Sequence, residues 1–222
     1  MDFEQYLTPT PTIESEHTAV RAFIAAQGAD QLDDPVACAV RLYYAVRDGF
    51  RYNPYQIDMS VDGLKATTTL AAKQGWCVTK AILLAACCRA QGIPARLGFA
   101  DVRNHLSTER MRQHMQTDVF LWHGYTDIYL AGQWVKATPA FNIELCAKFR
   151  LRPLAFNGRE DSIYHPFDLD GRQHMEYIRM RGVYADTPIA EITHTFQKHY
   201  SMMLKETVEA DFDKDVEREV QS

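Results

Sequence analysis

The stretch of fifteen residues from 77 to 91 is apolar at almost every position, and it constrains how the rest of the chain can fold. Its polar members are Thr79, Lys80, Arg89 and Gln91. The pattern is typical of a helix, which Gly92 would end in a left-handed conformation, with Pro94 just beyond. Because a helix that is apolar on nearly every side must be covered by other elements, we expect a central, buried helix.

Length and composition allow one large domain with a proper core, since 46% of the 222 residues are hydrophobic and 11% aromatic. No apolar run of about 18 residues occurs, so we expect no membrane-spanning helix. The acidic start of the chain does not resemble a signal peptide. The five cysteines are odd in number and form no C-x-x-C pair, which argues against a disulfide framework and structural zinc. We expect a reduced, cytoplasmic protein.

The net charge of −5 is concentrated at the C-terminal end of the chain. From Lys205 onward seven acidic residues stand against three basic ones, which accounts for −4 of that charge. The remaining body is therefore close to neutral. A near-neutral body gives no electrostatic reason to expect nucleic-acid binding.

The remaining segments are interpreted as a series of helices and strands. Helices are expected at 15–29, 35–49, 67–73 and 141–149, and strands at 96–100, 119–130 and 133–138. Residues 101–116 are polar and are interpreted as an inserted loop or short helix. We divide the chain into an N-terminal lead-in and helix, a core, a strand-rich extension of the same domain that contains further strands, and one long C-terminal helix with an acidic end. These parts span residues 1–34, 35–150, 151–187 and 188–222.

Cys77 stands at the first turn of the buried helix. A helix N-terminus carries a partial positive charge and unpaired backbone N–H groups, which stabilise a thiolate. A lowered thiol pKa makes a cysteine reactive near neutral pH, so we expect a pKa for Cys77 below the usual value of about 8.5. The alternative is an inert buried cysteine, because cysteine is among the most buried residue types.

A nucleophilic cysteine needs a base, and His123 is the best placed of the eight histidines. It lies in the hydrophobic strand 119–130, which can hold a catalytic group precisely. If Ala131-Gly132 forms the hairpin turn, His123 lies opposite Ala140, and Thr138 is its diagonal neighbour. We therefore expect the group that orients the imidazole to lie near Thr138.

Taken together, these pieces resemble the transglutaminase-like superfamily. The similarity is carried by Gly75-Trp76-Cys77 at the start of an apolar helix, Gly92-Ile93-Pro94-Ala95-Arg96, Trp122-His123 on a strand, and the hairpin from Tyr129 to Pro139. It covers roughly residues 35 to 142. The resemblance implies a papain-like α+β catalytic core, with a central buried helix packed on an antiparallel sheet, and a Cys-His-Asp triad.

Carried across by residue, the resemblance makes Cys77 the nucleophile and His123 the general base. The family has an aspartate just before the proline of the return strand, where this chain has Thr138 before Pro139. A threonine hydroxyl can accept a hydrogen bond from the imidazole, but it cannot stabilise an imidazolium by charge. Asp127 lies on the same strand face as His123 and is a substitute with less favourable spacing.

Some neighbouring residues are candidates for contacts with the reacting group. The backbone N–H of Cys77 would stabilise an oxyanion together with a second donor, for which Gln74 and the indole of Trp76 are candidates. Trp122 is a candidate for lining the substrate groove.

These features predict a cysteine-dependent acyl-transfer enzyme that acts on an amide bond of a peptide, a protein or a small amide. The protease, amidase and transglutaminase types share the first half of the reaction, and none of them needs a metal or an organic cofactor. The alternative is a non-catalytic binding or scaffold domain of the same fold, in which Thr138 marks a degenerate triad. The oligomeric state and the role of residues 151–222 are left open.

Overall fold

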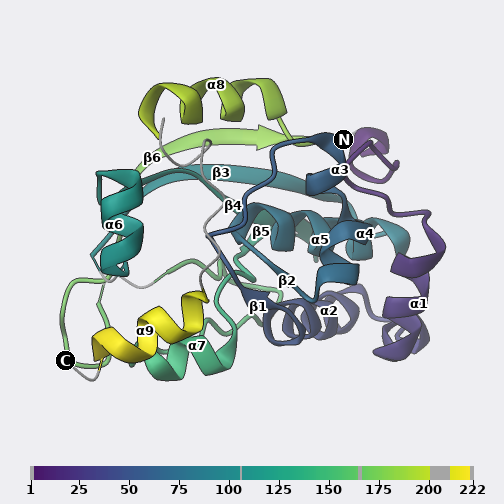
Figure 1. The fold of residues 1–222 in the computed structure, drawn as a ribbon. Helices are drawn as coiled ribbons and strands as arrows, with labels where there is room; N and C mark the ends of the chain where they lie inside the picture. The colour runs from purple at the N-terminus through teal and green to yellow at the C-terminus, as the bar shows by residue number, and fades with distance from the viewer. Residues whose placement is uncertain (1–2, 106, 165–166, 201–210, 221–222) are drawn as a thin grey trace.

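The computed structural model describes residues 3–105, 107–164, 167–200 and 211–220 (Figure 1). Its α-helices are α1 (Thr18–Ala26), α2 (Pro35–Gly49), α3 (Val61–Leu64), α4 (Ala66–Ala72), α5 (Cys77–Ala90), α6 (Glu109–Met115), α7 (Ile143–Lys148), α8 (Ile189–His199) and α9 (Phe212–Val220). Short 3-10 helices span Glu4–Tyr6 and Ala29–Gln31. The strands are β1 (Arg51–Tyr52), β2 (Gln74–Gly75), β3 (Ala95–Asn104), β4 (Val119–Leu130), β5 (Gln133–Ala137) and β6 (Met175–Tyr184).

The main sheet is antiparallel, with its strands in the order β5-β4-β3-β6. Strand β6 belongs to the predicted extension 151–187, and it completes the sheet by pairing with β3. Strands β1 and β2 form a separate parallel pair, in which Arg51 lies opposite Gln74. This short pair fixes the segment that leads into Cys77.

Helix α5 has the central position that its composition predicts (Figure 1). Every residue from Cys77 to Arg89 is buried, and the helix packs against β3 and β4 and against α1, α2 and α4. Gly124 of β4 permits a close approach of the two elements, since a Cβ atom there would lie 3.0 Å from the Cα atom of Val78. The expected α+β class, with a central buried helix packed on an antiparallel sheet, is confirmed.

The β4–β5 hairpin has the predicted register. Leu130 lies opposite Gln133, and both turn residues have positive φ, 48° at Ala131 and 90° at Gly132. Such a two-residue turn matches the twist of the strands that it joins. The ladder runs from there to the pair Thr126 and Ala137.

The structure corrects the sequence interpretation in the region after β3 and in the C-terminal part. Strand β3 continues to Asn104, so the first residues of the segment 101–116 are strand, and α6 is the helix among its described residues. One long C-terminal helix is wrong, because α8 ends at His199. Tyr200 leaves the helix as its hydroxyl donates to the carbonyl of Val119 (2.6 Å) and accepts from the backbone N–H of Leu121 (2.7 Å). Part of that predicted helix, 201–210, lies outside the described residues.

Within the described ranges no helix is long and apolar enough to cross a membrane.

Candidate active site

Cys77 is the first residue of α5, directly after the extended residue Trp76. The hydroxyl of Thr79 accepts from the backbone N–H of Trp76 at 3.1 Å, which closes the first turn. The pairing of β2 with β1 holds the preceding residues. The expected placement of a thiol at the start of a buried helix is therefore observed, with Cys77 6% exposed.

His123 follows directly after a bulge in β4. Ala100 pairs with His123 and Val102 with Phe120, so Asp101 faces two residues of β4. One of them, Trp122, has the left-handed φ of 60°, and its backbone N–H donates to Oδ1 of Asp101 at 3.2 Å. Bulges and left-handed non-glycine residues occur frequently next to active sites, where they re-aim a side chain.

Cys77 and His123 line the same cavity, which has a volume of about 30 Å³. Its other walls are mainly apolar and include Tyr52 of β1, Met111 of α6 and Phe196 of α8. A space of this size holds about one water molecule. The two side chains therefore border one small, mainly apolar space, which is too small for a substrate.

Both groups are neutral near pH 7. Burial raises the pKa of Cys77 to about 11, although hydrogen bonds from the backbone of Gly124, Val78 and Cys77 itself act in the opposite direction. Burial, assisted by the charge of His174, lowers the pKa of His123 to about 4. The expectation of a lowered thiol pKa is wrong for this closed state, because desolvation outweighs the helix N-terminus.

The expected hydrogen bond between Thr138 and His123 is not formed. Nε2 of His123 and the hydroxyl of Thr138 are both buried without a hydrogen-bond partner among the described residues. The Thr138 hydroxyl is near enough to that of Tyr177 to lower its pKa, without the geometry of a hydrogen bond. Asp127 is no substitute, since its Oδ2 forms an ion pair with Arg96 at 2.8 Å.

Comparison with known proteins identifies the family of this chain. The family model of the transglutaminase-like superfamily matches residues 23–139, which include both Cys77 and His123. The chain belongs to the transglutaminase-like superfamily. Residue 138, for which the resemblance implies an aspartate, is a threonine whose hydroxyl has no hydrogen-bond partner among the described residues.

Among solved structures, the chain is similar to a candidate cysteine protease from Cytophaga hutchinsonii, with 16% sequence identity and a TM-score of 0.47. The match covers 81% of this chain and 53% of the other, so the chain spans about half the length of that protein. No curated protein matches the chain.

The candidate oxyanion and substrate residues of this transglutaminase-like chain lie in different places. Trp76 lines the cavity with Cys77. The amide of Gln74 is engaged elsewhere, since its Oε1 accepts from Arg51 at 3.3 Å and from Asn53 at 3.4 Å. Trp122 lies between β3, β6 and α8, where its indole N–H donates to the hydroxyl of Thr195 at 3.0 Å and its ring packs near Phe99 and Tyr184.

Residues outside the family match also contact the histidine. The ring of Tyr164 lies 5.5 Å from that of His123 and 5.6 Å from that of His174. The Tyr164 hydroxyl and both ring nitrogens of His174 are buried without a hydrogen-bond partner among the described residues. Tyr164 and His174 lie in irregular backbone. The sequence there has no periodic pattern from which their place at the site could be predicted.

The described residues contain no group of three or more His, Cys, Asp or Glu side chains that could hold a metal ion.

Proposed function

We propose that this transglutaminase-like chain is a cysteine-dependent acyl-transfer enzyme that acts on an amide bond. Cys77 is the nucleophile and His123 the general base. The observation that carries the proposal is the shared cavity of these two side chains, one at the start of α5 and the other after the β4 bulge. The five cysteines are all free and buried, which supports a reducing compartment such as the cytoplasm.

In the first half of the reaction the thiol proton of Cys77 passes to the imidazole of His123 as the sulfur attacks the amide carbon. A neutral thiol and a neutral imidazole suit this combined transfer. The backbone N–H of Cys77 and the indole N–H of Trp76 are the candidate donors to the oxyanion. The carbon–nitrogen bond then breaks, and the leaving amine takes the proton from His123.

In the second half, the thioester on Cys77 is attacked by water or by an amine. His123 accepts a proton from the attacking group, and the sulfur leaves with a proton returned by the imidazole. Attack by water gives hydrolysis, whereas attack by an amine gives transamidation. The substrate is a peptide, a protein or a small amide.

Intact-mass measurement after incubation with a library of peptides and amides tests the proposal. The wild-type protein should gain the mass of an acyl group on Cys77, and Cys77→Ala should gain none. Cys146→Ala is a matched control, because burial raises the pKa of that buried thiol to about 11 as well. The proposal fails if no acyl group is found, or if Cys146 is modified as fast as Cys77.

A second candidate function is a non-catalytic binding domain. It is favoured by the unpaired Thr138 hydroxyl and by the absence of a hydrogen bond to Nε2 of His123 among the described residues. Such a domain would bind a peptide equally well with Cys77 or with alanine at that position, and no acyl group would appear on the protein.

A further inference from the structure

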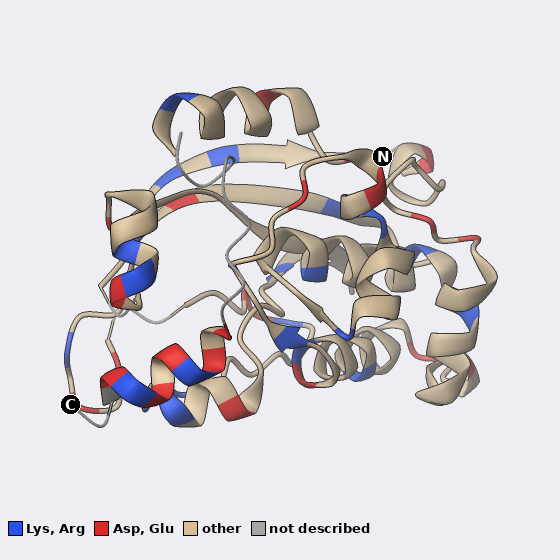
Figure 2. Cartoon of the chain, in the orientation of Figure 1, with Lys and Arg blue, Asp and Glu red and all other residues tan. Residues whose placement is uncertain are grey.

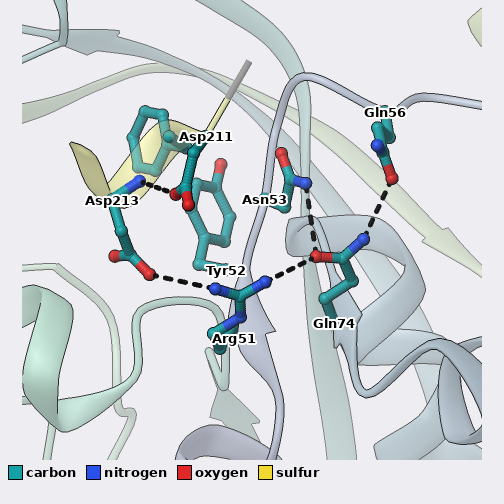
Figure 3. Close-up of a pocket in the computed structure, with 8 residues that line it drawn as sticks. Arg51, Tyr52, Asn53, Gln56, Gln74, Asp211 and Asp213 are labelled. Carbon is teal, nitrogen blue, oxygen red and sulfur yellow. Dashed lines mark hydrogen bonds and ion pairs between the residues drawn. The ribbon is translucent and has the colours of Figure 1, made fainter. Parts of the chain in front are cut away.

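A polar groove with a volume of about 310 Å³ lies next to the closed cavity of Cys77 and His123 (Figure 3). One wall consists of residues from the family core, among them Arg51, Asn53 and Gln74. The other wall is the start of α9, with Asp211 and Asp213. Helix α9 lies outside the family match, which ends at residue 139. A segment outside the core therefore occupies one side of a groove that the core provides.

The core side of the groove has the chemistry to bind a carboxylate. Nη2 of Arg51 donates to Oε1 of Gln74, and its Nη1 lies 3.8 Å from Oδ2 of Asp213. Nζ of Lys148 in α7, which lies outside the family match and beyond the lining of the groove, approaches the other oxygen of Asp213 at 3.3 Å and Oε1 of Glu217 at 3.0 Å. Two cations thus converge on one carboxylate, while Gln74 holds the guanidinium in place. Figure 2 shows the acidic and basic residues that gather on α9.

Phe212, between the two aspartates, fills an aromatic socket beside the histidine. Its ring centroid lies 5.3 Å from that of Tyr55, 5.8 Å from that of Tyr52 and 6.3 Å from that of Phe149. Phe212 also lines one cavity together with His123. Since Tyr52 borders the groove and both cavities at His123, the socket and the catalytic pair share a wall.

The rest of α9 keeps this segment in position. Oδ2 of Asp215 accepts from the hydroxyl of Tyr55 at 2.8 Å and from Nε of Arg110 at 2.6 Å. Val216 is completely buried. Helix α9 is therefore docked through side chains on both the core and α6.

We propose that Asp211-Phe212-Asp213 occupies one side of the substrate groove as an intramolecular ligand. The substrate is then a peptide in which an aromatic residue is followed by a carboxylate. Its aromatic ring enters the socket of Phe212, and one carboxylate takes the place of Asp213 between Arg51 and Lys148. This inference rests on the proposed function in calling the peptide a substrate. Binding of such a peptide to the groove can be tested without catalysis.

The test measures binding of a fluorescent peptide with the sequence of residues 209–216 to full-length proteins that lack the nucleophile. The Cys77→Ala protein keeps its own Phe212 in the socket, whereas the double variant with Phe212→Ala has an empty one. If the groove is free in only a small fraction of the molecules, the apparent affinity for the peptide is reduced by that fraction. The double variant should therefore bind the peptide roughly 10- to 100-fold more tightly than Cys77→Ala.

Two control peptides test the ligand class. A peptide with asparagine in place of the aspartate that follows the phenylalanine should bind the double variant more weakly. A further change of Arg51→Gln in the protein should remove this difference. A peptide with alanine in place of the phenylalanine should not bind the socket.

Asp213→Lys, made in the Cys77→Ala protein, is a second way to free the groove. It leaves Phe212 unchanged. Lysine at position 213 would be repelled by Arg51 and Lys148, and peptide binding should again increase. Equal binding by Cys77→Ala and both opened variants, or equal binding of the aspartate and asparagine peptides, would overturn the inference. Tight binding without any acyl group on the wild-type protein would uphold the groove and reject the proposed enzyme.

Discussion

Lys80, one turn after Cys77 on α5, donates a hydrogen bond of 2.7 Å to the backbone carbonyl of Ala140. Its other two N–H groups bind the carbonyls of Arg47 at 2.9 Å and Phe50 at 2.7 Å. The three donors of the ammonium group are thus all used, in a side chain without exposed surface. Lys80 therefore fixes the start of α5 relative to the end of α2 and to the segment after β5.

Lys80→Met should destabilise the protein, because it leaves three buried carbonyl groups without a donor. We expect the free energy of unfolding to fall by about 3 kcal/mol or more. Burial lowers the pKa of Lys80 to about 7, so urea unfolding is best followed at pH 6, where the ammonium form prevails. Lys65→Met, which removes only the exposed ion pair with Asp62, is the control and should change stability little. Equal stability of the two variants would show that the three bonds contribute nothing.

Thr138→Asp should restore the charge that the family places beside the histidine. A carboxylate beside an imidazole favours the imidazolium, so we expect this substitution to raise the pKa of His123 above its value of about 4. A more basic imidazole takes the thiol proton of Cys77 more readily. We expect alkylation of Cys77 by iodoacetamide at pH 7 to become about 10-fold faster, since such a charge shifts a pKa by about one unit or more.

Thr138→Asn and Thr138→Ala are the controls for this charge. Asparagine has nearly the shape of aspartate, but it carries no charge and should leave the alkylation rate unchanged. Alanine should do the same, because the Thr138 hydroxyl makes no hydrogen bond to the histidine. An equal acceleration by asparagine would mean that space at this position, and not charge, governs the reactivity of Cys77.

Local patterns predicted the central helix and the hairpin, because both depend on neighbours in the sequence. The apolar run after Cys77 required burial, and the Ala131-Gly132 turn fixed the register of β4. The φ of Trp122 could not be predicted in this way, since glycine is the residue that usually signals a left-handed conformation. The socket of Phe212 depends on Tyr55, which is far away in the sequence. Such long-range contacts produce no periodic pattern in the sequence.

The same distinction explains why Cys77 and His123 could be proposed from the sequence as candidate site residues, whereas their ionisation could not be predicted. The order of motifs identified Cys77 and His123, which share a cavity. Their pKa values depend on how completely α6 and α8 exclude water, and this is a property of tertiary packing. The position of Cys77 at a helix N-terminus was predicted correctly, but the predicted direction of its pKa shift was wrong.

Asp101→Ala should disturb the position of His123 through the β4 bulge. Oδ1 of Asp101 accepts from the backbone N–H of Trp122 at 3.2 Å and from Nε of Arg181 at 2.5 Å. Without the Asp101 carboxylate, the left-handed residue Trp122 loses the hydrogen bond that holds its backbone N–H. Because small displacements of a catalytic group are costly, acylation of Cys77 should slow by roughly 10- to 100-fold. Arg181→Ala breaks the same ion pair but keeps the acceptor for Trp122, so it should slow acylation much less.

Acid should destabilise the protein through its two buried histidines. Burial lowers the pKa values of His123 and His174 to about 4 each, whereas an unfolded histidine has a pKa of about 6.5. Between these two pKa values the unfolded chain binds more protons than the folded one, so stability falls as the pH is lowered from 6.5 to 4. Each imidazole should account for about 3 kcal/mol of this loss. Urea unfolding at several pH values measures it, and the double variant His123→Gln and His174→Gln should lose less stability over that range. The exposed His194→Gln should keep the full dependence, and a double variant with an unchanged slope would contradict the assignment to the buried pair.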